Sequence, residues 1–475
     1  MKKSRMMVAI AAMALPFSGG LKAETVTLSL EKALEIALSE NVSVKVADME
    51  VERVGFAKKG TYASLFPQID ATGMFQRTIK KQVMYMDFDM GAIGGMSGGS
   101  STEETAGGGE SEASSSKNGG GFEVGRWNTW SGGITAAMPL VNAQLWKSLQ
   151  ISGMDVELAV EKARSSRLQT VAQTKQAFFG VLLAKEAFKV YKDVYENAVV
   201  NFELTERKYK AEKVSEMEYL RAKTNLSNAV PNVYNAESSV ILALWQLKAV
   251  MGVDLEMEID TEGELADFAD QMFRDIHEND EVNLDMNSTM RQLAIQAEEL
   301  AASIKLQKYA YLPTLSLAFN YSYNAMTNDF DFSEYRWTPY SYVGLSLSIP
   351  IFSGGKRLNN VRQTKNQYNQ LKLQTQDTER QLRIAIRNSL TTMETQMKSY
   401  NAAKEAVEMA SKSYTIVQKS YEVGRSTMTD LNDAQLALTQ SRLAESQAVY
   451  NFVVAKAQLE QTLGADFTGY DKSNE

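Results

Sequence analysis

The fold is decided by a stretch that occurs twice, first as Gly133-Ile134-Thr135-Ala136-Ala137-Met138-Pro139-Leu140-Val141 and then, 211 residues later, as Gly344-Leu345-Ser346-Leu347-Ser348-Ile349-Pro350-Ile351-Phe352. Two further landmarks recur at an offset of 212 residues: Tyr209, Ala222 and Leu226 as Tyr421, Ala434 and Leu438, and Leu247 and Gly252 as Leu459 and Gly464. Three matches in register indicate an internal duplication. The chain is therefore predicted to contain two structural repeats, residues 24–255 and 286–466.

The first repeat contains an insertion. Residues 63–69 (ASLFPQI) resemble residues 309–315 (YAYLPTL), but here the offset is 246 residues, so the first repeat is 35 residues longer between its two proline landmarks. The excess coincides with residues 91–121, which are rich in Gly, Ser and Glu. Such a composition cannot bury enough apolar surface to fold, so a flexible loop between two strands is expected there.

Four segments have the pattern of strands, at about 68–82, 129–138, 314–324 and 340–349. Residues 345–349 alternate apolar and polar side chains, the period of a sheet with two different faces. The length of the segments suits a tilted membrane strand of about 9–11 residues. Aromatic residues bracket the second hairpin: Tyr321, Tyr323, Tyr335, Trp337, Tyr340 and Tyr342. They are expected to lie in the interfacial belt of a membrane barrel. In the alternative fold, a soluble sandwich, they would form the core.

Helices are predicted over residues 143–250 and 356–463, beginning with two long ones at about Ala143–Lys210 and Lys356–Tyr421. Each long helix would extend on the order of 100 Å, far more than a compact domain. From Ile386, apolar side chains recur every seven residues, the seam of a coiled coil, at Met393, Tyr400, Val407, Tyr414 and Tyr421. Pro231 predicts a kink in the helix after the first turn, because it removes a backbone donor.

Composition limits the class of protein. Residues 1–23 resemble an export signal peptide, whose apolar run is too short to span a bilayer. The formal charge is −8, and removing the basic residues of the signal (Lys2, Lys3, Arg5 and Lys22) leaves −12, which argues against a nucleic-acid partner.

The chain has no cysteine and one histidine, His277, so it lacks the residues for catalysis by a nucleophile paired with a histidine, and neither an enzyme nor a cofactor is expected. His277 lies in an acidic inter-repeat segment, residues 256–285; residues 467–475 form a C-terminal tail.

The predicted strands are too few to close a pore. A barrel without edges needs at least about eight strands. An open four-stranded sheet in lipid would leave backbone groups unpaired, each costing several kcal/mol. If the strands lie in a membrane, several chains must share one barrel, and three chains, with twelve strands, suit a wide pore better than two.

Several motifs in this order resemble the TolC-type outer-membrane efflux protein family. Residues 28–37 (LSLEKALEIA) followed by Asn41 resemble the opening helix of that family, residues 350–355 (PIFSGG) its second strand-to-helix turn, and residues 421–434 (YEVGRSTMTDLNDA) its periplasmic tip. The resemblance implies a mainly α fold with a membrane β-barrel: a homotrimer with a shared 12-stranded barrel in outer-membrane lipid, continued by a long α-helical coiled-coil tunnel into the periplasm. It also implies a periplasmic adaptor (membrane fusion protein) and an inner-membrane RND pump or ABC transporter as partners.

The resemblance assigns roles to residues at the tips. Asp430 and Asp433 match two aspartates that form acidic rings in the pore, and Tyr421 matches a tyrosine of the network that closes the tip. Gly424 and Arg425 belong to the same gate, although the arginine of the family aligns with Ser426. Aspartates at i and i+3 share a helix face, and mutual repulsion in a trimeric ring would raise some of their pKa values; a role for Asp430 as a helix cap is the simpler alternative. The adaptor is expected to contact Ala211, Glu212, Lys213, Val214, Ser215, Val423, Arg425, Ser426 and Thr427.

The function expected is an outer-membrane channel of a tripartite efflux or secretion complex. It would be a passive exit duct, gated at the helical tips. Two alternatives remain at this stage. Met84, Met86, Met90 and Met96 suggest a copper-type metal-ion efflux channel, because thioethers bind Cu(I). A secreted coiled-coil scaffold or adhesion protein would also have heptads and no active site.

Overall fold

A computed structural model describes residues 26–84, 122–273 and 284–464. The predicted signal peptide 1–23, loop 91–121 and tail 467–475 lie outside these residues, as do His277, Met86, Met90 and Met96. The chain forms two compact units: a sheet unit of residues 58–151 and 302–362, and a helical unit made by the remainder. Each unit takes segments from both predicted repeats.

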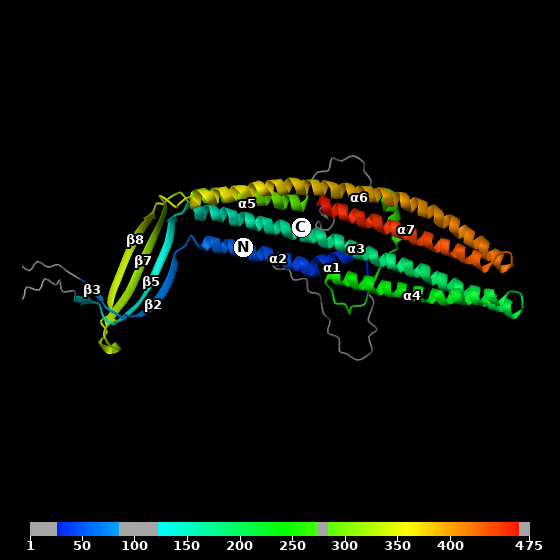
Figure 1. Cartoon of the computed structure of the whole chain (residues 1–475), viewed down its shortest axis with the longest axis horizontal. Helices are drawn as coiled ribbons and strands as arrows, with labels where there is room; N and C mark the ends of the chain where they lie inside the picture. Colours follow the sequence, from blue (N-terminus) through cyan, green and yellow to red (C-terminus); the bar gives the residue numbers. More distant parts are fainter. Residues whose placement is uncertain (1–25, 85–121, 274–283, 465–475) are drawn as a thin grey trace, which may run out of the picture. The chain divides into compact units, whose positions relative to one another are not determined.

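The sheet unit contains four antiparallel strands in the order β2-β5-β7-β8 (Figure 1). The strands are β2 (Gln68–Arg77), β5 (Asn128–Val141), β7 (Thr314–Thr327) and β8 (Thr338–Ser348). The strand predicted at 68–82 ends at Arg77, and a separate ladder of β3 (Gln82–Met84) with β4 (Phe122–Val124) follows it. A short 3-10 helix, η3 (Phe332–Glu334), lies between β7 and β8. Sequential hairpins β2–β5 and β7–β8 are thus joined through the β5–β7 pairing.

The register gives this sheet one apolar and one polar face. Directly opposite residues of antiparallel strands point to the same side, and the pairs Leu317–Leu345, Phe319–Val343 and Ile134–Ala71 share one face. The other face carries small and polar pairs, including Asn320–Tyr342, Ser322–Tyr340, Ser316–Ser346 and Thr72–Gly133. The apolar side chains are exposed within the protomer, with Val343 at 70% and Leu345 at 67%.

The aromatic residues around the second hairpin do not form one belt. Tyr321 and Tyr323 lie on the apolar face, and their hydroxyls are 2.8 Å apart. Tyr340 and Tyr342 lie on the polar face, because they pair with Ser322 and Asn320. The expectation of a single interfacial belt is therefore wrong for Tyr340 and Tyr342, because odd and even positions of a strand point to opposite sides of the sheet.

Gly133 lies where β5 approaches β7 closely. A Cβ atom added at this glycine would lie 2.6 Å from the carbonyl oxygen of Tyr321, too close for any side chain. Its equivalent in the second repeat, Gly344, has only the Tyr342 ring nearby, at 3.7 Å. The glycine of the repeated stretch is therefore required by packing in β5 and not in β8.

The rest of the chain is mainly helical. Its helices are α1 (Leu30–Glu40), α2 (Val42–Ala63), α3 (Ala143–Lys210), α4 (Glu216–Met251), α5 (Ser288–Tyr309), α6 (Lys356–Glu422) and α7 (Met428–Leu463). The helical unit also holds β1 (Val26–Leu28), paired in parallel with β6 (Ile259–Thr261), and the 3-10 helix η2 (Leu265–Phe273). No helix in the described ranges is both long and apolar enough to cross a membrane. Pro231 lies inside α4, which runs as one helix from Glu216 to Met251, and the kink expected at Pro231 stays a prediction.

The heptad row of α6 forms part of the helical core. Ile386, Met393, Tyr400, Tyr414 and Tyr421 are all buried. Along α7 the matching buried residues are Leu431, Leu438, Ala448, Phe452 and Ala455. Seven-residue spacing keeps one face of each long helix toward its neighbours.

Two asparagine side chains hold equivalent helix junctions in the helical unit. The side-chain amide nitrogen of Asn41 donates to the carbonyl oxygen of Val250 at 2.6 Å, and that of Asn287 donates to Thr462 at 2.5 Å. Each side-chain oxygen also accepts from backbone N–H groups at the start of the next helix. Each asparagine therefore caps one helix and satisfies a terminal carbonyl of another.

A left-handed glycine completes each junction. Gly252 (φ 75°) ends α4, and Gly464 (φ 69°) ends α7. An added Cβ at Gly252 would lie 2.7 Å from the carbonyl oxygen of Glu40, and one at Gly464 would overlap the carbonyl oxygen of Met286. Both conformation and space thus require glycine at these two positions.

Candidate gate at the helical tips

Each of two tips in the helical unit is a tight turn between two helices. The second residue after the first helix is in the left-handed conformation in both tips: Glu212 (φ 59°) after α3 and Gly424 (φ 80°) after α6. The N–H of Glu212 donates to the carbonyl oxygen of Tyr209 at 2.8 Å, and that of Gly424 donates to Tyr421 at 3.1 Å. This geometry favours glycine, so Glu212 carries backbone strain that Gly424 avoids.

A hydroxyl caps the second helix of each tip. The Ser215 hydroxyl accepts from the N–H of Glu218 at 3.3 Å, and the Thr427 hydroxyl accepts from the N–H of Asp430 at 3.2 Å. Only the second tip has the reciprocal bonds, in which the Asp430 carboxylate accepts from the N–H of Thr427 at 2.9 Å and from its hydroxyl at 2.8 Å. Asp430 is therefore the partner in a capping box.

The capping bonds set the protonation of Asp430. Hydrogen bonds from the Thr427 backbone and hydroxyl stabilise the carboxylate and lower the pKa of Asp430 below its ordinary value of 3.8. Within one protomer this direction is opposite to the rise expected from repulsion in a ring of carboxylates. Asp430 is therefore ionised at neutral pH while it also holds the helix start.

Asp433 lies one turn further along the same exposed side of α7. The equivalent residue of the first tip, 212 positions earlier, is Arg221, so the two tips differ in charge at this position. Arg221 donates to the hydroxyl of Thr429 at 3.2 Å and thereby links the two tips. Only the second tip has a carboxylate at both of these equivalent positions, because the first tip has Glu218 and Arg221 there.

The other predicted tip residues lie on the surface. Val214 and Ser426 are half-buried. The remaining residues expected to contact an adaptor are exposed: Ala211, Glu212, Lys213, Ser215, Val423, Arg425 and Thr427. Arg425 contributes its backbone N–H to the turn, at 2.8 Å from the carbonyl oxygen of Ser420.

Tyr421 is buried at the base of the second tip. Its hydroxyl lies 2.6 Å from the hydroxyl oxygen of Thr205 in α3. Thr205 donates its own hydroxyl proton to the carbonyl oxygen of Asn201 at 2.7 Å, so Tyr421 is the donor in the shared bond. Burial raises the pKa of the Tyr421 phenol above its ordinary value of 10, which keeps this donor protonated at physiological pH.

The sequence did not predict the role of Lys208. Its ammonium nitrogen donates to the carbonyl oxygen of Tyr421 at 2.7 Å and lies 4.7 Å from the centre of the Tyr421 ring. Lys208 thus satisfies a terminal carbonyl of α6 and makes a cation–π contact. A basic residue in the last turn of α3 was visible in the sequence, but its partner is more than two hundred residues away.

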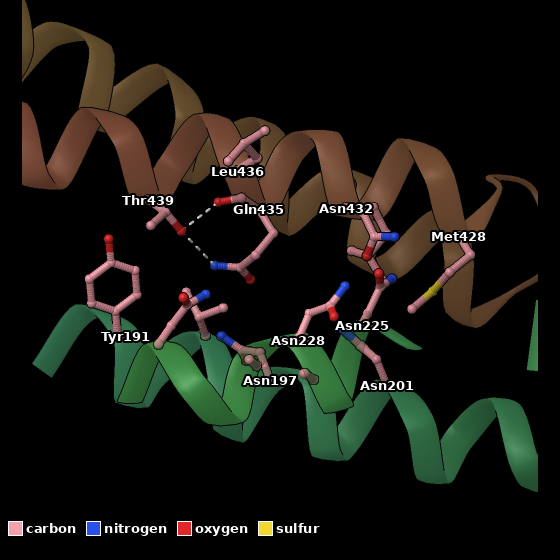
Figure 2. A pocket seen from close by; sticks show the side chains of 15 residues that line it. Tyr191, Asn197, Asn201, Asn225, Asn228, Met428, Asn432, Gln435, Leu436 and Thr439 are labelled. Atoms are coloured by element: carbon pink, nitrogen blue, oxygen red, sulfur yellow. Dashed lines mark hydrogen bonds between the residues drawn. The ribbon is translucent and has the colours of Figure 1, made fainter. Parts of the chain in front are cut away.

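A cavity lined with amide side chains lies between α3, α4 and α7 (Figure 2). Its volume is about 290 Å³. Its lining includes Asn197, Asn201, Asn225, Asn228, Asn232, Asn432 and Gln435. The asparagines of α4 recur at helical spacing, a signal that sequence analysis could have used.

The comparisons with known proteins agree with this architecture. The family described as "Outer membrane efflux protein" matches residues 33–253 and 282–465. Outer membrane protein TolC of Escherichia coli (strain K12) is 21% identical over 349 residues, covering 71% of this chain and 70% of that protein. The alkaline protease secretion protein AprF of Pseudomonas aeruginosa is 21% identical over 333 residues, covering 69% and 68%.

Solved structures share the fold. The Campylobacter jejuni CmeC outer membrane channel superposes with a TM-score of 0.68 at 18% identity, covering 95% of this chain and 92% of that one. The open state of the Neisseria gonorrhoeae MtrE outer membrane channel has a TM-score of 0.64 at 16% identity, covering 94% and 93%. Since the family match extends over most of its residues, the chain belongs to the outer membrane efflux protein family.

Proposed function

We propose that this protein is the passive exit duct of a tripartite efflux or secretion complex. The observation that carries the proposal is the four-stranded sheet with one exposed apolar face and one polar face. An apolar face of this extent is unfavourable in water and suits lipid, whereas the polar face suits a water-filled lumen. The alternative of a secreted coiled-coil scaffold gives this face no partner.

The free edges of the sheet support a trimer. Among the described strands, β2 and β8 each pair on one side only. In lipid their outer backbone groups need partners, so β8 of one protomer would pair with β2 of the next. Three protomers would close a barrel of twelve strands with an aqueous lumen. The long helices of each protomer would continue this conduit into the periplasm.

The second tip would act as the gate of the conduit. Three copies of Asp430 and Asp433 around a narrow axis would form two carboxylate rings, which attract cations and repel anions. The bond between Tyr421 and Thr205 ties α6 to α3 and would hold the tip closed. The asymmetry between the tips supports this assignment, because the first tip has Arg221 in place of an aspartate.

The duct would depend on other proteins for energy and substrate. The exposed turns at residues 211–215 and 423–427 would dock onto a periplasmic adaptor, which connects to an inner-membrane RND pump or ABC transporter. The family match is to outer membrane efflux proteins in general, so the general efflux or secretion duct is favoured over the copper-efflux alternative.

Conductance in planar bilayers tests the proposal. The purified protein is expected to form cation-preferring pores that multivalent cations block. Asp430→Asn and Asp433→Asn, which keep side-chain oxygens for hydrogen bonding, should each reduce cation preference and blockade. Glu218→Gln is the matched control, because Glu218 is the first-tip equivalent of Asp430 and should leave both properties unchanged. Failure to form pores would refute the duct, and unchanged selectivity in both aspartate variants would refute the gate.

A further inference from the structure

The helix ends that join the sheet carry charge of one sign. Within the sheet unit, residues 58–67, 142–151, 302–313 and 349–362 contain eight basic residues and no acidic ones. All four segments meet the same end of the sheet, since Gln68 pairs with Ala137 and Thr314 pairs with Ser348. We call the basic residues of these segments the basic collar. Lys305, Lys308, Lys356 and Arg362 are exposed members of it.

The opposite end of the sheet does not share this charge. Residues 77–84, 122–128 and 327–338 contain five basic and four acidic residues, nearly balanced. The nearest acidic residue of a strand to the basic collar is Asp70, whose pairing with Thr135 places it on the polar face. The apolar face therefore ends directly at segments of the sheet unit that contain basic residues and no acidic ones.

Exposed apolar side chains are interleaved with the basic collar. Phe66 is 65% exposed, Trp146 57% and Phe352 87%. Aromatic rings next to Lys and Arg are typical of the boundary between acyl chains and headgroups, where the rings enter the apolar layer and the cations extend to phosphates. An acidic soluble protein would match the charge but would leave these rings against polar surface.

We propose that the basic collar binds anionic phospholipid headgroups in the periplasmic leaflet of the outer membrane, and thereby fixes the depth of the sheet in the bilayer. The inference rests on the proposed function, because it requires the sheet to lie in the membrane. Clusters of basic residues beside a membrane segment attract anionic lipids, by roughly fivefold in binding for each charge near the surface. The attraction is electrostatic and weakens when salt shortens its range.

Electron spin resonance of labelled lipids measures the effect. The full-length protein is reconstituted in phosphatidylcholine vesicles with trace spin-labelled phosphatidylglycerol or phosphatidylcholine, and the ratio of their association constants is the selectivity. At low salt the selectivity for phosphatidylglycerol should be at least about threefold, falling toward one at about 1 M salt. This salt titration tests the wild-type protein without any substitution.

Two variants that each lose four positive charges give the matched comparison. Lys305→Gln, Lys308→Gln, Lys356→Gln and Arg362→Gln together should bring the selectivity close to one. Lys80→Gln, Lys81→Gln, Arg126→Gln and Arg336→Gln together, at the opposite end of the sheet, should leave it unchanged.

Three results would overturn the lipid site: no selectivity in the wild-type protein, equal loss in both variants, or a collar variant that keeps its selectivity but loses binding to a soluble acidic protein. Conductance of the same preparations separates the two proposals. Pores without lipid selectivity refute only the lipid site, whereas a protein that forms no pores refutes the duct.

Discussion

Removing the Tyr421 hydroxyl tests whether the bond to Thr205 holds the tip closed. Tyr421→Phe deletes the donor of the 2.6 Å bond. It leaves the Lys208 contacts intact, because these involve the ring and the carbonyl oxygen of residue 421. Thr205 keeps its own bond to the carbonyl oxygen of Asn201, so no donor is left unpaired. The substitution therefore isolates one hydrogen bond.

The expected effect follows from the value of one buried hydrogen bond. A neutral hydrogen bond contributes about 1 kcal/mol to the state that forms it. If the three tips of a trimer open together, Tyr421→Phe would shift the opening equilibrium by about 3 kcal/mol, on the order of a hundredfold. Single-channel recording in planar bilayers measures this as a rise in open probability.

Thr205→Val and the double variant complete a cycle. Thr205→Val leaves the Tyr421 hydroxyl buried without its acceptor and should open the tip at least as much as Tyr421→Phe. The double variant should open it less than the sum of the two single effects, because the residues act through one bond. Tyr209→Phe, at the equivalent position of the first tip, is the control. Unchanged open probability in Tyr421→Phe, or an equal change in Tyr209→Phe, would refute the reasoning.

Four further substitutions have defined outcomes, each measured as a shift in the thermal unfolding of the purified protein. Gly464→Ala should destabilise by at least about 2 kcal/mol through left-handed strain and overlap with Met286, whereas Gly424→Ala, with open space around it, should cost only about 1 kcal/mol; equal costs would contradict the overlap. Glu212→Gly should stabilise by about 1 kcal/mol, because it removes left-handed strain from a residue with a side chain; destabilisation would show that the Glu212 side chain contributes more. The capping box should make the protein less stable in acid. Because the pKa of Asp430 is lowered below its ordinary value of 3.8, the ionised carboxylate stabilises the fold fully above pH 3.8, and this stabilisation is lost as the pH falls further. Asp430→Ala should remove this part of the pH dependence.

The sequence was sufficient for the local elements, because their patterns are local. Two long helices were predicted at about Ala143–Lys210 and Lys356–Tyr421, and α3 and α6 occupy those ranges. Alternation at residues 345–349 predicted a strand with two different faces, which is how β8 is arranged. The resemblance to the efflux family came from motifs in order, and the family match bears it out.

Pairings between distant segments were decided only by the tertiary structure. The bonds of Tyr421 with Thr205 and of Arg221 with Thr429 join residues more than two hundred positions apart. The sequence around Tyr421 or Arg221 does not indicate which residue it will bond to, because the pairing of helix faces depends on how whole helix surfaces pack.

The same division applies to the strands and to Asp430. Periodicity determined that each strand has an apolar side, but only the register of β5 against β7 decided that four such sides form one continuous face, and that Tyr340 lies opposite it. The sequence left open whether Asp430 caps a helix, faces the pore or does both. The folded turn shows the cap, because it brings the Thr427 N–H within hydrogen-bonding distance of the Asp430 carboxylate. The periodicity of a helix or strand follows from backbone geometry that is the same at every residue, so it can be recognised in the sequence. A contact between distant residues depends on where the rest of the chain lies, which only the tertiary structure shows.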